Sequence, residues 1–168
     1  MNMRALMKLS GLAALLGGGL RIASALPLPM GVLAQEALWD AIDVLLTLGL
    51  IGIYIARAST LGFLGLAGFV CAMAALSFIG GPDADPFGFS TYEQGAAILA
   101  ISLAGFSIAW LRAGERPVLA PLCWFGSVIA AGVLGMAPPP LPDYHFMAAG
   151  ALFGAGFAVA GWDLLRRP

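Results

Sequence analysis

The residues of this chain whose types could do chemistry are a few charged side chains inside long apolar runs. Arg21 stands six residues before Pro27 in an apolar segment, where a lone charge is costly unless it has a partner. Glu36, Asp40 and Asp43 follow at spacings of four and three residues, which places the three carboxylates on one helical face. Two antiparallel helices joined by a short loop would bring Arg21 and Asp43 to a similar depth, about 9 Å from the helix ends. We therefore expect an ion pair between Arg21 and Asp40 or Asp43.

The surplus of carboxylates in this cluster has two interpretations. One is a vestibule that binds a cation or a proton, with Asp43 as its deepest member. The other is structural, because carboxylates near a helix N-terminus are stabilised by the helix dipole. A structural role also fits Ser90 and Glu93, which have the spacing of a capping box, and Asp143, which has the type of an N-cap.

Tyr144 and His145 are secondary candidates. His145 is the only histidine and could titrate near neutral pH, but an interfacial histidine without a chemical role fits the sequence as well. An enzyme that acts on a lipid through Asp43, Tyr144 and His145 is a further hypothesis. Cys71 and Cys123 lie in separate apolar stretches, which indicates packing residues and predicts neither a disulfide nor a metal site.

The motifs of common catalytic sites are missing from the sequence. The only lysine, Lys8, lies near the N-terminus, which excludes a Schiff-base lysine in the middle of a helix, and a single histidine excludes bis-histidine haem. No Gly-x-Ser-x-Gly, His-Glu-x-x-His, phosphate-binding loop or dinucleotide fingerprint occurs. The net charge of −1 argues against a nucleic-acid partner. We therefore predict no cofactor and favour a protein that is not an enzyme.

The elements that must position these residues follow from composition. Hydrophobic residues make up 61% of the chain and charged residues 10%, whereas soluble domains carry about 25% charged residues. Apolar runs long enough to cross a hydrocarbon core of roughly 30 Å must be helical, because lipid offers the backbone no hydrogen bonds. We predict an all-α membrane protein, a compact bundle of six transmembrane helices in a single domain, residues 1–168. The expected spans are residues 9–26, 37–56, 61–80, 94–111, 118–137 and 145–165.

A threefold pattern suggests how the spans could be organised. Arginines recur at spacings of 55 and 54 residues and prolines at 55 and 56, which fits three consecutive helical hairpins. Any six-helix chain with short loops repeats near this length, so internal duplication stays an alternative. The residues are Arg57, Arg112, Arg166, Pro27, Pro82 and Pro138.

The basic residues predict the orientation. Seven of the eight fall on one side of a six-span arrangement, and only Arg21 falls toward the other. Because cytoplasmic loops are enriched in lysine and arginine, we place both termini in the cytoplasm and the protein in the cytoplasmic (inner) membrane. Trp110, Trp124 and Trp162 are expected in the aromatic belt of that side. The first 25 residues resemble a signal peptide, but Arg21 just before the possible cleavage site favours a retained first span.

Small residues predict how the helices pack. Gly150 and Gly154 form a small-xxx-small face, and Gly62, Gly65 and Gly68 line one side of the third span. We expect close helix packing within the chain at these glycines; a dimer face or a narrow cavity is the alternative.

The function expected from these observations is that of a non-catalytic membrane component: a subunit, a scaffold or a binder of lipid or another hydrophobic ligand. Its expected partners are the lipid bilayer, a second copy of the chain or a larger membrane complex. The alternative is a small transporter or channel-like protein that binds a cation or proton at the Arg21 cluster.

Overall fold

The computed structural model describes residues 2–26, 29–79, 90–139 and 144–167. All regular structure in these residues is helical, and each of the six expected apolar ranges overlaps one helix. The helices are α1 (Met3–Ala23), α2 (Val32–Ile55), α3 (Ala58–Ile79), α4 (Thr91–Arg112), α5 (Leu119–Gly135) and α6 (His145–Arg166).

Side-chain capping explains where α1 and α4 begin. Asn2 Oδ1 accepts a hydrogen bond from the backbone N–H of Arg4 at 2.7 Å, which starts α1 six residues earlier than expected. Ser90 Oγ accepts from the N–H of Glu93 at 3.2 Å, so the predicted N-cap of α4 is confirmed. The predicted N-cap Asp143 lies outside the described residues.

Five of the described helices are long and apolar enough to cross a membrane, and α5 is the exception. It has 17 residues, which corresponds to about 26 Å. It ends at Gly135, two residues earlier than expected, and a turn at Met136 and Ala137 leads into a proline-rich connector. A full crossing by all six helices therefore remains a prediction.

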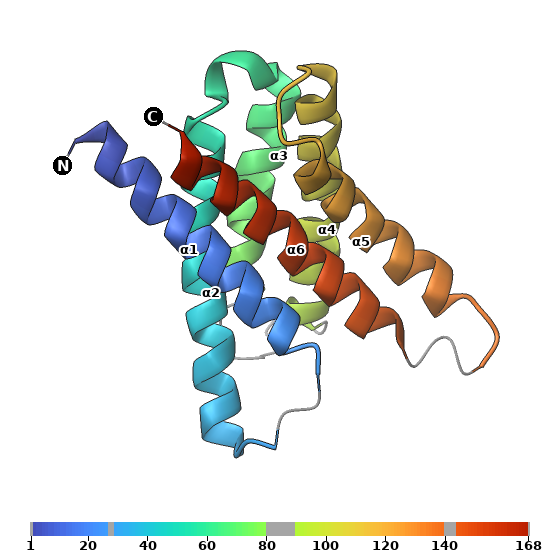
Figure 1. The fold of residues 1–168 in the computed structure, drawn as a ribbon. Coiled ribbons are helices and arrows are strands. Elements are labelled where there is room, and N and C mark those ends of the chain that lie inside the picture. Colours follow the sequence, from blue (N-terminus) through green and yellow to red (C-terminus); the bar gives the residue numbers. More distant parts are fainter. Residues whose placement is uncertain (1, 27–28, 80–89, 140–143, 168) are drawn as a thin grey trace.

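The helices are arranged as a closed ring (Figure 1). Each helix packs against its neighbours in sequence, and α6 packs against α1, so that the pairs α1–α2, α3–α4 and α5–α6 form hairpins. Both termini and the α2–α3 and α4–α5 connectors lie at one end of the ring (Figure 1). We call this the basic end, because it carries Arg57, Arg112, Arg116, Arg166 and Arg167 together with Arg4 and Lys8. The opposite end, with Glu36, Asp40, Asp43 and Glu93, is the acidic end.

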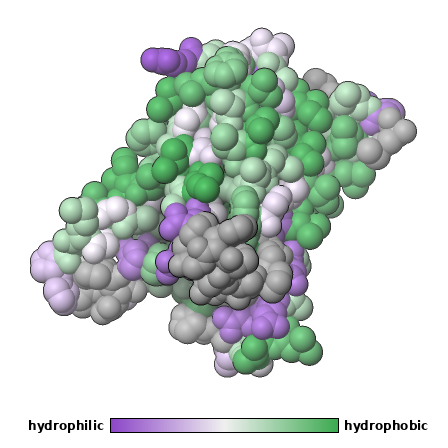
Figure 2. All heavy atoms as spheres, turned by 180° about the vertical axis from the view of Figure 1, so that it is seen from behind, coloured by the Kyte–Doolittle hydropathy of each residue, from purple (hydrophilic) through white to green (hydrophobic). Residues whose placement is uncertain are grey.

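The outer surface of the ring is largely apolar. Figure 2 shows hydrophobic residues over most of the flank of the molecule and hydrophilic residues mainly toward its ends. Every helix contributes large exposed hydrophobic side chains, for example Leu12, Val44, Phe63, Ile101, Val133 and Phe146. This surface is consistent with a protein embedded in a membrane.

The core of the ring is built on aromatic side chains. Trp124 lies between Phe106, Trp110 and Phe157, with ring centroids 5.1–6.0 Å apart. Trp110 and Trp124 are almost completely buried, so their predicted place in an interfacial belt is wrong. Only Trp162 among the three predicted belt tryptophans is exposed. The two buried rings instead fill space among α4, α5 and α6, because large rings bury the most apolar area per residue.

The contact between α1 and α6 depends on glycine. A Cβ at Gly154 would lie 2.5 Å from the carbonyl oxygen of Gly18, and a Cβ at Gly18 would in turn meet the carbonyl oxygen of Gly154. Gly11 and Gly161 repeat this close approach nearer the basic end. The predicted small-residue face of α6 therefore packs within the chain, against the backbone of α1.

Gly62 and Gly65 of α3 behave differently from the expectation. Gly62 adopts φ 60° and ψ −163°, which interrupts the helix, and no heavy atom lies within 4 Å of its Cβ position. Gly65 faces only Leu61 of its own helix. The residue that brings α3 close to α4 is Gly68, whose Cβ position is 2.9 Å from the backbone nitrogen of Phe106. Gly62 is thus a kink residue, because an L side chain rarely adopts this conformation.

We expect Gly18→Ala to lower the free energy of unfolding by about 1–3 kcal/mol, because the added methyl group forces α1 and α6 apart. Gly19→Ala is the matched control: it is the next residue of the same helix and has open space at its Cβ position. The control should be neutral or slightly stabilising. Denaturant unfolding in detergent, followed by far-ultraviolet circular dichroism, measures both variants. Equal effects of the two changes would contradict the close α1–α6 contact.

Candidate functional site

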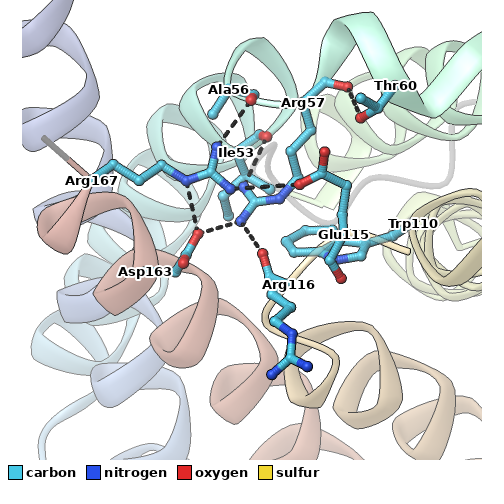
Figure 3. A network of polar contacts seen from close by, with 9 residues as sticks. All are labelled: Ile53, Ala56, Arg57, Thr60, Trp110, Glu115, Arg116, Asp163 and Arg167. Atoms are coloured by element: carbon cyan, nitrogen blue, oxygen red, sulfur yellow. Dashed lines mark hydrogen bonds and ion pairs between the residues drawn. The ribbon is translucent and has the colours of Figure 1, made fainter. Parts of the chain in front are cut away.

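The largest polar network of the described residues lies at the basic end and centres on Arg57 (Figure 3). Arg57 belongs to the short connector between α2 and α3 and has no exposed surface. Its partners come from α6 and from the connector between α4 and α5. Three segments that are distant in sequence therefore meet at one side chain.

The guanidinium of Arg57 is held on several sides. Its Nη2 forms an ion pair with Oδ2 of Asp163 and donates to the carbonyl oxygen of Arg116 at 3.1 Å. Its Nη1 donates to the carbonyl oxygen of Ile53 at 3.4 Å. The face of the group lies 3.9 Å from the ring centroid of Trp110, a cation–π contact. In the described part of the chain its Nε atom has no hydrogen-bond partner.

Arg167 extends the network. Its Nε donates to the same Oδ2 of Asp163 at 3.0 Å, and its Nη1 donates to the carbonyl oxygen of Ala56 at 3.1 Å. A longer ion pair of 3.8 Å joins it to Glu115, whose carbonyl oxygen accepts from Trp110 Nε1 at 3.0 Å. The Oδ2 atom of Asp163 thus contacts the guanidinium groups of both Arg57 and Arg167. Through these contacts the end of α6 is bound to the α2–α3 connector and to the α4–α5 connector.

Burial lowers the pKa of Arg57 to about 10, and the nearby Arg167 acts in the same direction, while Asp163 raises it. The group therefore remains a cation at neutral pH. A buried cation of this kind requires its carboxylate partner, so the network is suited to holding the basic end together rather than to exchanging protons.

At the acidic end, the side chain of Arg21 extends from α1 and lies against α2 and α6. Its guanidinium is 4.9 Å from the ring centroid of Trp39, and its Nη2 is 3.0 Å from the position a Cβ would take at Gly150. Its Nη1 donates to Ser24 Oγ at 3.3 Å. Gly150 therefore provides the space in which the guanidinium lies.

The predicted ion pair of Arg21 is not formed. Among the described residues no carboxylate oxygen lies within 4.0 Å of Arg21, and the contacts with Trp39 and Ser24 take its place. Asp43 is half-buried and acts on Arg21 through a longer electrostatic interaction. Asp40 is exposed. Arg21 and Asp43 were expected at a similar depth from the helix ends. This expectation is wrong because α2 begins at Val32, five residues before the expected start, which places Asp43 further along its helix.

The remaining candidates are spread over the acidic end. Glu36 is exposed near the start of α2. Tyr144 is exposed just before α6, and the ring of His145 lies 3.8 Å from that of Phe146. Within the described ranges no group of three or more histidine, cysteine, aspartate or glutamate residues could hold a metal ion.

The two cysteines are free, Cys71 exposed and Cys123 half-buried. A packing role is therefore wrong for Cys71, which lies on the outward face of α3.

The residues of the Arg57 network were missed as a site by sequence reasoning, which used the arginines for orientation and Arg57 also for the threefold pattern. One signal was available: Asp163 lies four residues before Arg167, and this local pair is present. A second signal is that, in the predicted six-span arrangement, Glu115 and Asp163 are the only acidic residues on the side that carries seven of the eight basic residues. The link to Arg57 joins residues 106 positions apart, which no local pattern indicates.

Compared with protein-family models, characterised proteins and solved structures, the chain matches none of them. Its function must therefore be inferred from its own residues.

We expect Asp163→Asn to lower the free energy of unfolding by about 3 kcal/mol, because it leaves the buried cation of Arg57 without its partner. Arg166→Gln is the matched control on the same helix, since Arg166 is exposed, and should change stability by less than about 0.5 kcal/mol. Thermal unfolding in detergent compares the two.

A double-mutant cycle separates the ion pair from general damage to α6. The variant Arg57→Met/Asp163→Leu replaces both charges by apolar groups and should lose less stability than the two single changes added together. Additive losses would contradict the role of this pair.

Proposed function

We propose that the protein is a non-enzymatic membrane component, a small helical subunit or scaffold whose outer surface binds lipid or the helices of a partner. The observation that carries this proposal is the apolar surface of the ring, to which all six helices contribute exposed hydrophobic side chains. The charged side chains of the described residues gather toward the two ends. The molecule thus offers its surroundings mainly an apolar flank, which suits contacts made inside a bilayer.

The packing of the ring supports the same proposal. Close backbone contacts at Gly18 and Gly154 and the network around Arg57 hold the helices together. A scaffold needs this rigidity, because a surface that binds a partner loses affinity when it must first be ordered.

We expect native mass spectrometry of the protein, extracted from its own membrane in mild detergent, to show a reproducible bound protein or lipid. Such a species would identify the partner directly. A bare particle from several independent extractions would contradict the proposal. Alkaline carbonate treatment of the same membranes provides the control, since a membrane-integrated chain stays with the lipid.

A second candidate function is transport of a cation or proton through the acidic end. The observation that favours it is the position of Asp43, which is half-buried in α2 near Arg21 and, among the residues that the structure describes, forms no direct ion pair. A carboxylate that is not neutralised by contact inside a membrane protein is a candidate ion-binding group.

The transport function predicts that Asp43→Asn abolishes cation or proton flux into liposomes while the protein stays folded. Asp40→Asn is the matched control, because Asp40 lies three residues earlier on the same helix and is exposed. Flux is measured with a pH-sensitive or cation-sensitive dye trapped in the liposomes. If wild-type protein carries no flux above empty liposomes, or if the two variants behave alike, the transport function is excluded.

A further inference from the structure

We propose that the basic end of the molecule binds the headgroups of anionic phospholipids in the leaflet that it faces. This inference rests on the proposed function, since it requires the helices to lie in a bilayer. It adds the chemical class of the lipid and the residues that recognise it.

Exposed cations gather at this end from three parts of the chain. Because α1 packs antiparallel to α6, the first turns of α1 lie beside the last turn of α6 (Figure 1). In the described ranges none of these cations takes part in an ion pair. The exposed basic residues are Arg4, Lys8, Arg112, Arg116 and Arg166.

The acidic residues of this end cannot neutralise these cations. Asp163 is shared by Arg57 and Arg167, and Glu115 is paired with Arg167. Both carboxylates are therefore used inside the network. Arg116 belongs to the network only through its backbone. Its carbonyl oxygen accepts a hydrogen bond from Arg57, while its own guanidinium points away from the network (Figure 3).

Neighbouring side chains indicate the depth of the exposed cations. Trp162 is 49% exposed, and the guanidinium of Arg166 lies 4.5 Å from its ring centroid. Tryptophan favours the boundary between headgroups and hydrocarbon, and arginine extends its charge from there toward water. Exposed Leu111 and Val118 flank the segment from Arg112, the last residue of α4, to Arg116 in the α4–α5 connector. These cations therefore lie at the level of lipid headgroups.

Charge complementarity selects the lipid. A phosphatidylcholine headgroup carries its own cation beside the phosphate, whereas phosphatidylglycerol carries net negative charge. Each basic side chain near the surface should favour the anionic lipid about fivefold, an effect that added salt reduces.

The test is native mass spectrometry of the full chain in detergent with equal amounts of dioleoylphosphatidylglycerol and dioleoylphosphatidylcholine. Wild-type protein should retain phosphatidylglycerol at least about fivefold more often. The variant Arg112→Gln/Arg116→Gln/Arg166→Gln should lose most of this preference. Its matched control, Arg112→Lys/Arg116→Lys/Arg166→Lys, keeps the charges and should keep the preference.

Equal retention of the two lipids by the wild type, or an unchanged preference in the glutamine variant, would overturn the inference. Failure of the proposed function gives a different result from failure of the lipid inference. If carbonate treatment releases the chain from its membrane, membrane integration itself is wrong. If the chain stays in the membrane but does not prefer phosphatidylglycerol, only the lipid inference fails.

Discussion

The buried guanidinium of Arg57 is the constraint on which the basic end depends. A cation without contact with water is costly unless a carboxylate and carbonyl oxygens replace its hydration. Here Asp163 supplies the charge, and the carbonyl oxygens of Ile53 and Arg116 supply further acceptors. These groups belong to α6, α2 and the α4–α5 connector. Only an arrangement that brings all of them together satisfies the arginine, so the network specifies how these segments meet.

The glycines of α6 link this end to the other. Gly161 and Gly154 bring the backbone of α6 against α1, and Gly150, one turn further on, faces the guanidinium of Arg21. One row of small residues therefore serves two purposes. It allows close backbone contact over two turns, and it leaves room for a charged side chain where α1 approaches its end. The position of Arg21 beside Trp39 is a consequence of that contact.

The sequence was sufficient for features that depend on local length and spacing. Apolar runs gave the number of helices, and the spacing of Gly150 and Gly154 gave the packing face of α6. It was insufficient where partners are distant in sequence. Trp110 looked interfacial because it stands near the end of an apolar run, but Arg57, far away in sequence, covers its ring. The ion pair expected for Arg21 failed because the expected helix ends were wrong: the first span was placed up to residue 26 and the second from residue 37, whereas α1 ends at Ala23 and α2 begins at Val32.

The two ends of the molecule differ both in the number of their charges and in how these charges are paired. At the basic end, both carboxylates are used by Arg57 and Arg167, so the remaining cations face outward. At the acidic end, Arg21 contacts Trp39 and Ser24, and within the described ranges it forms no direct ion pair with Glu36, Asp40, Asp43 or Glu93. The chain is nearly neutral as a whole, with a net charge of −1. Its surface nevertheless carries opposite charges at opposite ends, because the basic end holds seven of the eight basic residues and, among the described residues, only the carboxylates of Glu115 and Asp163. A membrane whose two faces differ in charge would distinguish the two orientations of such a molecule.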